Sequence, residues 1–466
     1  MRIGGKTVMA NRKPNVVVFL TDQQRWDTTG VHGNPLDLTP NFDRFATGGT
    51  HFYNTFTCQP VCAPARSSLQ TGQYATSTGV IANGIPLAED AVTLAKCFRS
   101  AGYQTGYIGK WHLGGAELGL KNWKQEPVTA RKRGGYEYWL AADAVEFTSD
   151  SYHTLLFDTN DKPVQLPGYR VDAVTDAAIR YIFENRNSSF FLFLSFLEPH
   201  HQNHTDNYPA PEGYAERYRG RWIPPDLATL GGTAHQHLGG YLGLVKRLDE
   251  AFGRLLDALK SLSLQDDTIV VFTSDHGNHF KTRNREYKRS CHESSIRVPL
   301  ALCGPHFNGG GRVTQLMSLV DLPPTILDAA GMAVPDLMQG RTAMPLIHGQ
   351  TIGWPDDVFV QISESQVGRA IRTKRWKYSV SATGVDAYAV PDAGEYTEEF
   401  LYDLEADPYE LTNLAGLDSH LEVSRQMKNR LLRRIRMHEG KSPAIRDAPV
   451  RHELDQRVVF PGDLPG

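Results

Sequence analysis

The stretch Asn15-Val-Val-Val-Phe-Leu-Thr-Asp22 decides the fold class of this 466-residue chain. A short, uninterrupted apolar run of this kind is typical of a strand buried on both faces, as in a parallel sheet flanked by helices. The run leads into Asp22 and Gln23, at the carboxyl end of the strand, where open α/β sheets bind their ligands. The stretch therefore predicts an α/β fold and the edge of the sheet at which a site would lie.

Three later apolar runs, within residues 103–108, 190–196 and 268–274, repeat this pattern. Polar or ionisable side chains follow each run closely. The residues that follow the four runs are Asp22 and Gln23, Lys110 and His112, Glu198 and His200, and Asp275 and His276. Because the carboxyl ends of parallel strands meet at one edge of a sheet, we predict that these side chains form a single site.

Helical patterns alternate with the predicted strands, which favours a large, mostly parallel sheet sandwiched between helices. The predicted helices cover residues 39–46, 87–101, 171–185 and 240–262. We interpret residues 114–170 as loop, because they are rich in glycine and aromatic residues and have no clear periodicity.

The pattern of predicted helices and strands changes after about residue 345. Short strand-like segments and one basic helix follow, at residues 358–363, 374–380, 399–404 and 421–438. They predict a small antiparallel sheet with one packed helix. We therefore expect a catalytic domain over residues 1–345 and a C-terminal α+β subdomain over residues 346–466.

The composition argues against several classes of function. A net charge of −3 provides neither a basic surface for nucleic acid nor a polybasic membrane anchor. The longest apolar run, residues 190–197, is far too short to span a bilayer. Residues 1–14 contain no apolar signal-peptide segment, so we expect a cytoplasmic protein. Five cysteines without a CxxC pair argue against a disulfide scaffold and against a zinc site.

A second stretch, Val61-Cys-Ala-Pro-Ala-Arg-Ser-Ser-Leu-Gln-Thr-Gly72, carries a cysteine at the head of a predicted helix. Pro64 suits the first turn, where its missing N–H costs nothing. The N–H groups at a helix start attract anions and lower the pKa of a thiol, and Arg66 lies one turn on, on the face of Cys62. The alternative for Cys62 is a buried structural thiol.

The predicted site also contains side chains suited to a hard cation and to an anionic ester. Asp22, Gln23 and Asp275 offer oxygen ligands and His276 adds a nitrogen, a set that suits Ca²⁺ or Mg²⁺ better than zinc. Positive charge and proton donors come from Arg66, Lys110, His112, His200 and Lys288. Such groups stabilise the charge that builds on the oxygens of a tetrahedral ester as it is cleaved.

These residues and their spacing resemble the type I, formylglycine-dependent sulfatases of the alkaline phosphatase superfamily. Cys62-x-Pro-x-Arg-x₄-Thr-Gly72 matches the modification signature of that family, and Gly109-Lys-Trp-His112 matches its second signature. Residues 275–277, 288–299 and 401–414 also look like the family.

The resemblance implies a sulfuric-ester hydrolase with the fold of alkaline phosphatase. A formylglycine-generating enzyme would oxidise Cys62 to formylglycine, whose hydrate attacks sulfur with one hydroxyl and expels sulfate with the second. The implied Ca²⁺ ligands are Asp22, Gln23, residue 62, Asp275 and His276. By the same resemblance, Arg66 and His112 orient and deprotonate the hydrate, and Lys110 and Lys288 bind the sulfate. His200 protonates the leaving group, and Asn83 contacts the substrate.

The polar, aromatic segments 119–170 and 200–237 could wall a sugar pocket, so we expect a sulfated carbohydrate as the substrate. An aryl or choline sulfate is the simpler alternative. Gln23 and His276 stand where many members carry aspartate and asparagine, and the same variant occurs in relatives that hydrolyse phosphonate monoesters and phosphodiesters. That activity is a further alternative.

A non-catalytic binding protein, in which Cys62 stays a thiol, is the remaining hypothesis. No function is assigned to Cys58, to Cys291 or to His292, which stands where a tyrosine is common in the family. A homo-oligomer is the default assembly.

Overall fold

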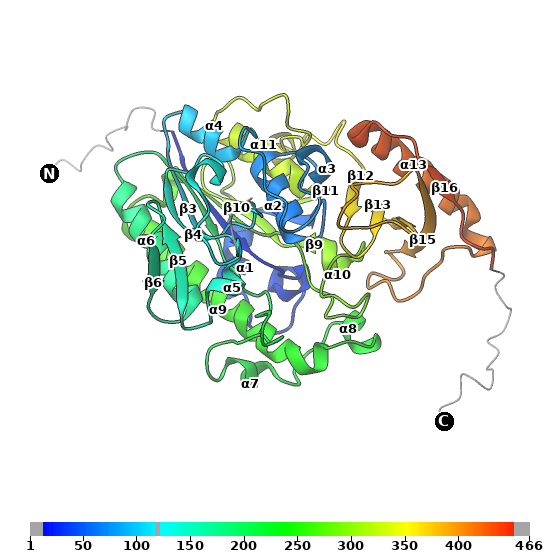
Figure 1. Ribbon diagram of the computed structural model, residues 1–466, viewed down its shortest axis with the longest axis horizontal. Coiled ribbons are helices and arrows are strands. Elements are labelled where there is room, and N and C mark those ends of the chain that lie inside the picture. Colours follow the sequence, from blue (N-terminus) through cyan, green and yellow to red (C-terminus); the bar gives the residue numbers. More distant parts are fainter. Residues whose placement is uncertain (1–12, 117–121, 452–466) are drawn as a thin grey trace.

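The computed structural model describes residues 13–116 and 122–451 (Figure 1). Its main body is a large sheet covered by helices, and a smaller sheet with one long helix lies beside it. The predicted α/β fold with a second, smaller sheet is therefore confirmed. Residues 119–121, at the start of one predicted wall of a sugar pocket, lie outside the described residues.

The large sheet has a parallel centre and antiparallel pairings nearer its margins. Its strand order is β11-β2-β10-β8-β1-β7-β3-β4-β5-β6, with β9 paired to β2. The parallel centre consists of β8 (Thr268–Ser274), β1 (Asn15–Thr21), β7 (Phe190–Ser195), β3 (Gln104–Lys110) and β4 (Tyr138–Ala142). The outer strands are β2 (Thr50–Phe56), β5 (Thr154–Asp158), β6 (Pro163–Leu166), β9 (Arg297–Val298), β10 (Leu300–Cys303) and β11 (Gly311–Ser318). Because β10 is antiparallel to β8 and β2, and β5 to β4 and β6, the sheet is mixed.

Two apolar layers hold the helices against the faces of this sheet. Alternate side chains of a strand point to opposite faces, so Val17 and Phe19 of β1 belong to one layer and Val16 and Val18 to the other. The first layer includes side chains of α1 (Pro40–Gly48), α6 (Arg170–Asn185) and α9 (Ala234–Ser261). The second includes side chains of α2 (Cys62–Thr71), α4 (Leu94–Ser100) and α11 (Leu322–Ala329).

Shorter helices connect these elements. They are α3 (Ala75–Thr78), α5 (Val145–Thr148), α7 (Tyr214–Tyr218), α8 (Pro225–Thr229), α10 (Glu293–Ile296) and α12 (Met344–Ile347). None of the helices in the described ranges has the length and apolar character that crossing a membrane requires.

Two predicted segments are wrong in detail. The helix expected over residues 87–101 begins only at Leu94, because the Thr93 hydroxyl accepts a hydrogen bond from the backbone N–H of Lys96 (3.2 Å) and caps it there. The segment interpreted as loop, residues 114–170, contains β4, α5, β5 and β6. These strands have only four or five residues each, too few for a clear alternation of apolar and polar side chains.

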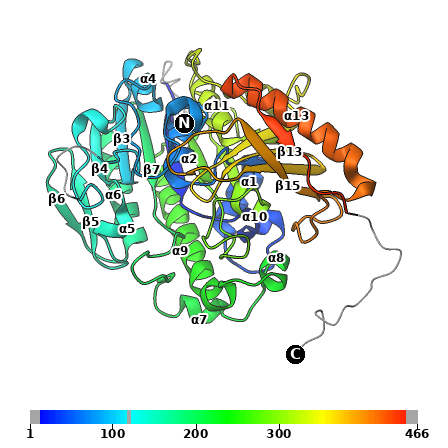
Figure 2. The ribbon, with the colours of Figure 1, turned by 45° about the vertical axis from the view of Figure 1, so that its right-hand side comes forward.

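The small sheet lies at the C-terminal side, with α13 (Leu421–Glu439) packed on it (Figure 2). Its strands are β12 (Asp357–Ile362), β13 (Val367–Thr373), β14 (Trp376–Ala382), β15 (Glu395–Asp403) and β16 (Ala444–Arg446). All neighbouring pairs are antiparallel except β15 and β16, which are parallel. The domain boundary near residue 345 stays a prediction.

The three residues without an assigned function are packed where the small sheet meets the main body. Cys291 lies in an apolar cluster with side chains of β12, and Cys58 lies in another with side chains of β13 and α13. His292 Nε2 lies 3.1 Å from the hydroxyl of Tyr402 in β15. Burial raises the pKa of both thiols, that of Cys58 to about 11 and that of Cys291 to about 12. These contacts are those of structural residues.

Candidate active site

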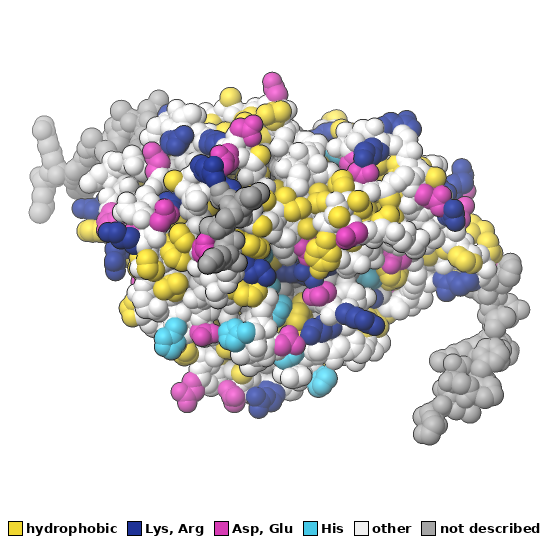
Figure 3. All heavy atoms as spheres, viewed as in Figure 1, with side chains coloured by type: hydrophobic (Ala, Val, Ile, Leu, Met, Phe, Trp, Pro, Cys, Tyr) yellow, Lys and Arg dark blue, Asp and Glu magenta, His cyan; other side chains and the backbone are white. Residues whose placement is uncertain are grey.

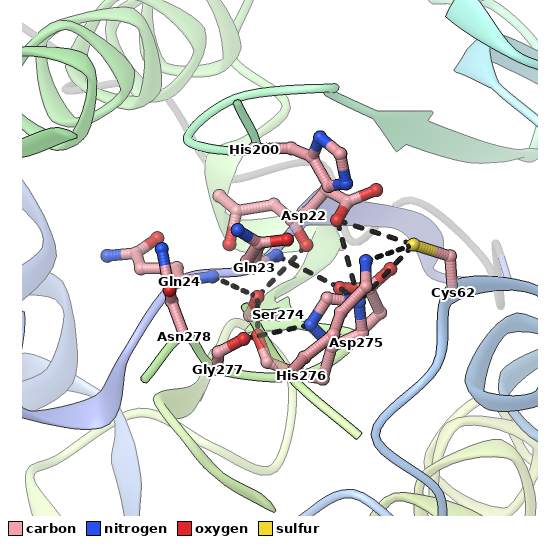
Figure 4. Close-up of polar contacts among 12 residues, drawn as sticks. Asp22, Gln23, Gln24, Cys62, His200, Ser274, Asp275, His276, Gly277 and Asn278 are labelled. Carbon is pink, nitrogen blue, oxygen red and sulfur yellow. Dashed lines mark hydrogen bonds and ion pairs between the residues drawn. The ribbon is translucent and has the colours of Figure 1, made fainter. Parts of the chain in front are cut away.

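Two carboxylates meet at the carboxyl ends of β1 and β8. The strands are parallel neighbours whose last residues, Thr21 and Ser274, are paired, so Asp22 and Asp275 follow side by side (Figure 4). Both are fully buried. Gln23 adopts a left-handed backbone conformation (φ 71°), and its N–H donates to Asp275 Oδ1 (3.1 Å). Adjacent strand ends therefore create the acidic centre that the sequence predicts.

Cys62 is the first residue of α2 and faces this centre (Figure 4). Its Sγ lies 3.3 Å from His276 Nε2 and 3.7 Å from Asp22 Oδ1. One donor atom from each of Asp22, Cys62, Asp275 and His276 lies within 4.8 Å of all the others. These four side chains form one compact donor set.

Two buried ammonium groups approach the same sulfur atom. Lys288 Nζ lies 2.8 Å from Cys62 Sγ and 3.0 Å from His276 Nε2. Lys110, the last residue of β3, has its Nζ 3.9 Å from Cys62 Sγ and 2.8 Å from Asp22 Oδ2. The sulfur therefore sits in a strongly positive environment at the start of a helix, which favours an anion there.

A glycine makes the position of Lys110 possible. Gly109 has a φ of 108°, a conformation that L side chains rarely adopt, and a Cβ at this position would lie 1.9 Å from the carbonyl oxygen of Ser195. Only glycine allows β3 to approach β7 this closely at its end.

Arg66 binds the acidic centre from within α2. Its guanidinium donates to Asp22 Oδ2 (3.0 Å) and to Asp275 Oδ2 (3.1 Å). A third hydrogen bond goes to the Ser195 hydroxyl (2.7 Å). Because the guanidinium is itself buried, it compensates both carboxylates in a medium where unpaired charges are costly.

Neighbouring carbonyl groups fix the tautomers of two site histidines. His276 Nδ1 lies 3.0 Å from the Gly277 carbonyl oxygen and His200 Nδ1 lies 2.6 Å from that of His201. A carbonyl only accepts, so each Nδ1 donates, and Nε2 is left for the site. His112 is buried, and its Nδ1 has no hydrogen-bond partner among the described residues.

Charge interactions outweigh burial at the sulfur and at its nearest carboxylate. Burial raises the pKa of Cys62, but Lys110, Lys288 and His276 lower it by a larger amount, so that the pKa lies well below its ordinary value. Burial and Cys62 raise the pKa of Asp22, yet Lys110, His200 and Lys288 leave it below the ordinary range. Both groups therefore favour their charged forms.

Eight of the eleven predicted site residues make hydrogen bonds or ion pairs with one another at this centre, and His112 and His200 lie close enough to lower the pKa of Cys62 and of Asp22. Asn83 contacts it only indirectly, because its Oδ1 accepts from the N–H of Ala63 (3.0 Å), next to Cys62. Sequence reasoning missed Glu146, which is buried beside Lys110 (3.3 Å). Asp143 directly follows β4 and Glu146 comes three residues later, but the short β4 has no clear periodicity that would mark it as a strand.

Comparison with known proteins agrees with this geometry. A family model described as Sulfatase matches residues 14–332, and one described as N-sulphoglucosamine sulphohydrolase, C-terminal, matches residues 285–437. The chain is 29% identical over 441 residues to the Ulvan-active sulfatase of Formosa agariphila, covering 91% of this chain and 81% of that protein. It is 24% identical over 539 residues to the N-acetylglucosamine-6-O-sulfatase of Bacteroides thetaiotaomicron, covering 97% and 90%.

The fold is also similar to that of a solved structure. The crystal structure of yidJ from Bacteroides fragilis, a protein classed as a sulfatase, superposes with a TM-score of 0.81 at 25% identity and covers 94% of this chain and 98% of that one. The sulfatase model alone matches more than half of the chain. The chain belongs to the sulfatase family, within the alkaline phosphatase superfamily, and is an enzyme that hydrolyses sulfate esters.

Proposed function

We propose that this sulfatase removes sulfate from a sulfated carbohydrate, with formylglycine made from Cys62 as the nucleophile. The observation that carries the proposal is the position of Cys62 Sγ, 2.8 Å from the Lys288 ammonium and 3.9 Å from that of Lys110. A structural cysteine needs no buried ammonium groups. The oxygens of an attacked sulfate ester do, because they gain charge in the transition state.

Formylglycine, once formed, supplies a hydrated aldehyde with one hydroxyl to attack sulfur and another to release sulfate. In our proposal Lys110 and Lys288 bind the nonbridging oxygens of the ester. His200 directs Nε2 to the site and, in its doubly protonated form, donates the Nε2 proton to the departing alcohol oxygen. His112 accepts the proton of the attacking hydroxyl. Arg66 orients the hydrate and also keeps its hydrogen bonds to the carboxylates of Asp22 and Asp275.

The donor set fits a hard cation, for which we propose Ca²⁺, with Mg²⁺ as the other candidate. His276 directs the lone pair of Nε2 toward Asp22 Oδ1 (3.6 Å) and Asp275 Oδ1 (3.5 Å), an arrangement that a cation between them stabilises. Gln23 Oε1 is buried and has no hydrogen-bond partner among the described residues, which leaves a further oxygen ligand. A cation bound there would add positive charge beside residue 62.

Two observations support a carbohydrate as the alcohol. Both relatives named above carry the names of carbohydrate sulfatases, for ulvan and for N-acetylglucosamine 6-O-sulfate. The segments expected to wall a sugar pocket also touch, because exposed His204 pairs with exposed Asp150 (3.2 Å). Figure 3 shows histidine and acidic side chains interspersed on the lower half of this face, below α5. A polar rim of this kind suits a hydroxylated substrate.

A phosphonate monoesterase or phosphodiesterase is the second candidate, and the pair Gln23 and His276 motivates it. Replacing a carboxylate ligand by Gln23 removes one negative charge from the donor set. A phosphonate monoester and a phosphate diester each carry one negative charge, as a sulfate monoester does, so the positive side chains of the site can bind either of them as well.

Release of inorganic sulfate or phosphate from a substrate panel tests both candidates. The panel contains sulfated monosaccharides that include N-acetylglucosamine 6-sulfate, together with 4-nitrophenyl sulfate, choline sulfate, a phosphonate monoester and a phosphate diester. We expect the highest kcat/KM for a sulfated sugar. Hydrolysis confined to aryl or choline sulfate would refute the carbohydrate assignment, and a faster phosphorus ester would favour the second candidate.

A further inference from the structure

A buried carboxylate that the proposed mechanism does not use lies at the edge of the site. Glu146, in α5, has a side chain that is only 4% exposed. Its Oε1 lies 3.3 Å from Lys110 Nζ, and its Oε2 is buried without a hydrogen-bond partner among the described residues. Half of this carboxylate is therefore paired, and the other half has free lone pairs.

The backbone of Glu146 is held by the segment that carries His200. The side-chain amide of Gln202, two residues after His200, donates to the carbonyl oxygens of Glu146 (3.0 Å) and Ser149 (2.9 Å). The Arg170 guanidinium in turn donates to Gln202 Oε1 (3.3 Å). The carboxylate and the proposed general acid therefore keep a fixed relative position.

The surroundings favour the charged form of the carboxylate. Burial raises the pKa of Glu146, but its electrostatic interactions, of which the one with the Lys110 ammonium is the largest, outweigh burial and leave the pKa below its ordinary value. A buried, charged oxygen without a donor is strongly unfavourable. This cost is removed if a hydrogen-bond donor arrives from outside the protein.

We propose that Glu146 determines specificity by accepting a hydrogen bond from an O–H or N–H group next to the sulfate ester on the substrate. The inference rests on the proposed function. Lys110 marks the sulfate side of the site and His200 the leaving-group side. Glu146 contacts Lys110 (3.3 Å), and its backbone is held by Gln202, two residues after His200. A donor that reaches Oε2 is therefore carried by the alcohol, close to the ester oxygen. Sugars have such vicinal donors, and simple aryl sulfates do not.

A pair of matched substrates tests this inference. 2-Hydroxyphenyl sulfate and 2-methylphenyl sulfate have similar shape, and only the first has a donor beside the ester. We compare kcat/KM for the two esters in the wild type, in Glu146→Gln and in Glu146→Leu. A hydrogen bond to a charged acceptor predicts a preference for the hydroxyl ester that falls about 10- to 100-fold in Glu146→Leu. The fall in Glu146→Gln is smaller, since an uncharged acceptor remains.

The ratio of kcat/KM for the hydroxyl ester to kcat/KM for the methyl ester distinguishes substrate recognition by Glu146 from a structural role. If Glu146 only held Lys110 in place, both esters would lose the same factor and the ratio would stay constant. Glu198→Gln is the matched control, because Glu198 is also buried, is paired with Arg170 (2.8 Å) and has an unpartnered Oε2. We expect Glu198→Gln to leave the ratio unchanged. A ratio that is equal in all variants would overturn the inference.

Binding provides a readout that does not depend on turnover. In the Cys62→Ala background, calorimetry measures the affinity of each ester for protein with and without Glu146→Leu. We expect tighter binding of the hydroxyl ester only where Glu146 is present, and equal affinities would overturn the inference. If the wild type bound both esters but released sulfate from neither, the proposed function would fail while this comparison still decided the role of Glu146.

Discussion

Replacing Arg66 by methionine tests the acidic centre and its cation together. The change keeps a long side chain in α2 but removes the guanidinium that pairs with both Asp22 (3.0 Å) and Asp275 (3.1 Å). Breaking a buried ion pair by removing one partner costs about 3–5 kcal/mol, because the remaining charge is uncompensated. With an unfolding entropy of about 2.1 cal/mol/K per residue, 466 residues correspond to roughly 1 kcal/mol/K. Without metal, Arg66→Met should therefore melt about 3–5 °C below the wild type.

Calcium should reverse most of this loss. A cation between the carboxylates takes over the charge that Arg66 provided, so Ca²⁺ should raise the melting temperature of Arg66→Met more than that of the wild type. The matched control is Arg170→Met, which leaves the Glu198 carboxylate uncompensated instead of the two carboxylates of the donor set. Differential scanning calorimetry with EDTA and then with Ca²⁺ measures both effects. Equal shifts of the melting temperature with Ca²⁺ in all three proteins would show that no cation binds between Asp22 and Asp275.

Three further predictions concern the chemistry, the cation and the pH dependence. Lys288→Met should lower kcat/KM for sulfate release by about 10²- to 10³-fold, the usual effect of removing one transition-state donor. Steady-state kinetics of correctly folded Lys288→Met and of the wild type measures this effect. Chelation with EDTA should abolish sulfate release, and added Ca²⁺ should restore it better than Mg²⁺, which requires a stricter octahedral geometry; full activity after exhaustive chelation would exclude a metal. Burial raises the pKa of Asp249 to about 6 from 3.8, so the folded state holds its proton more tightly, and stability present below about pH 4 is lost as pH rises through about 6. Urea unfolding should show the wild type losing about 3 kcal/mol relative to Asp249→Asn over that interval; a constant difference would contradict the assignment.

The sequence predicts the centre of the fold well because long apolar runs carry a strong signal. Strands β1, β7 and β8 are buried on both faces, so every residue in them is selected for burial. The polar residues that follow them stand out for the same reason. Asp22, His200 and Asp275 can therefore be placed at one edge of a sheet from the sequence alone.

The margins of the molecule were harder to predict for equally physical reasons. Strand β2 (THFYNTF) and strand β11 (GRVTQLMS) contain several polar residues, and they pair with each other although Thr50 and its partner Gly311 are far apart in the chain. Glu146 was missed because β4, which leads to it, spans only five residues. The antiparallel insertion of β10 between β8 and β2 leaves no local sequence signal, since orientation is set by the path of the connecting chain.

Contacts between the small sheet and the site were also beyond sequence reasoning. Glu364, between β12 and β13, accepts a hydrogen bond from the N–H of Asn83 (2.6 Å), and Arg289 pairs with the same carboxylate (2.5 Å). These residues lie far apart in the chain, and in the sequence Glu364 and Arg289 look like ordinary surface charges. Only the packed structure brings them beside the start of α2.

Peptide mass spectrometry across residue 62, combined with kinetics, decides whether Cys62 is the precursor of the catalyst. Protein made with and without co-expressed formylglycine-generating enzyme provides samples with different fractions of aldehyde at residue 62. We predict that the rate of sulfate release rises in proportion to the aldehyde fraction and falls to background in Cys62→Ala. Sulfate release by protein whose Cys62 is entirely an unmodified thiol would show that the catalyst is not made from Cys62.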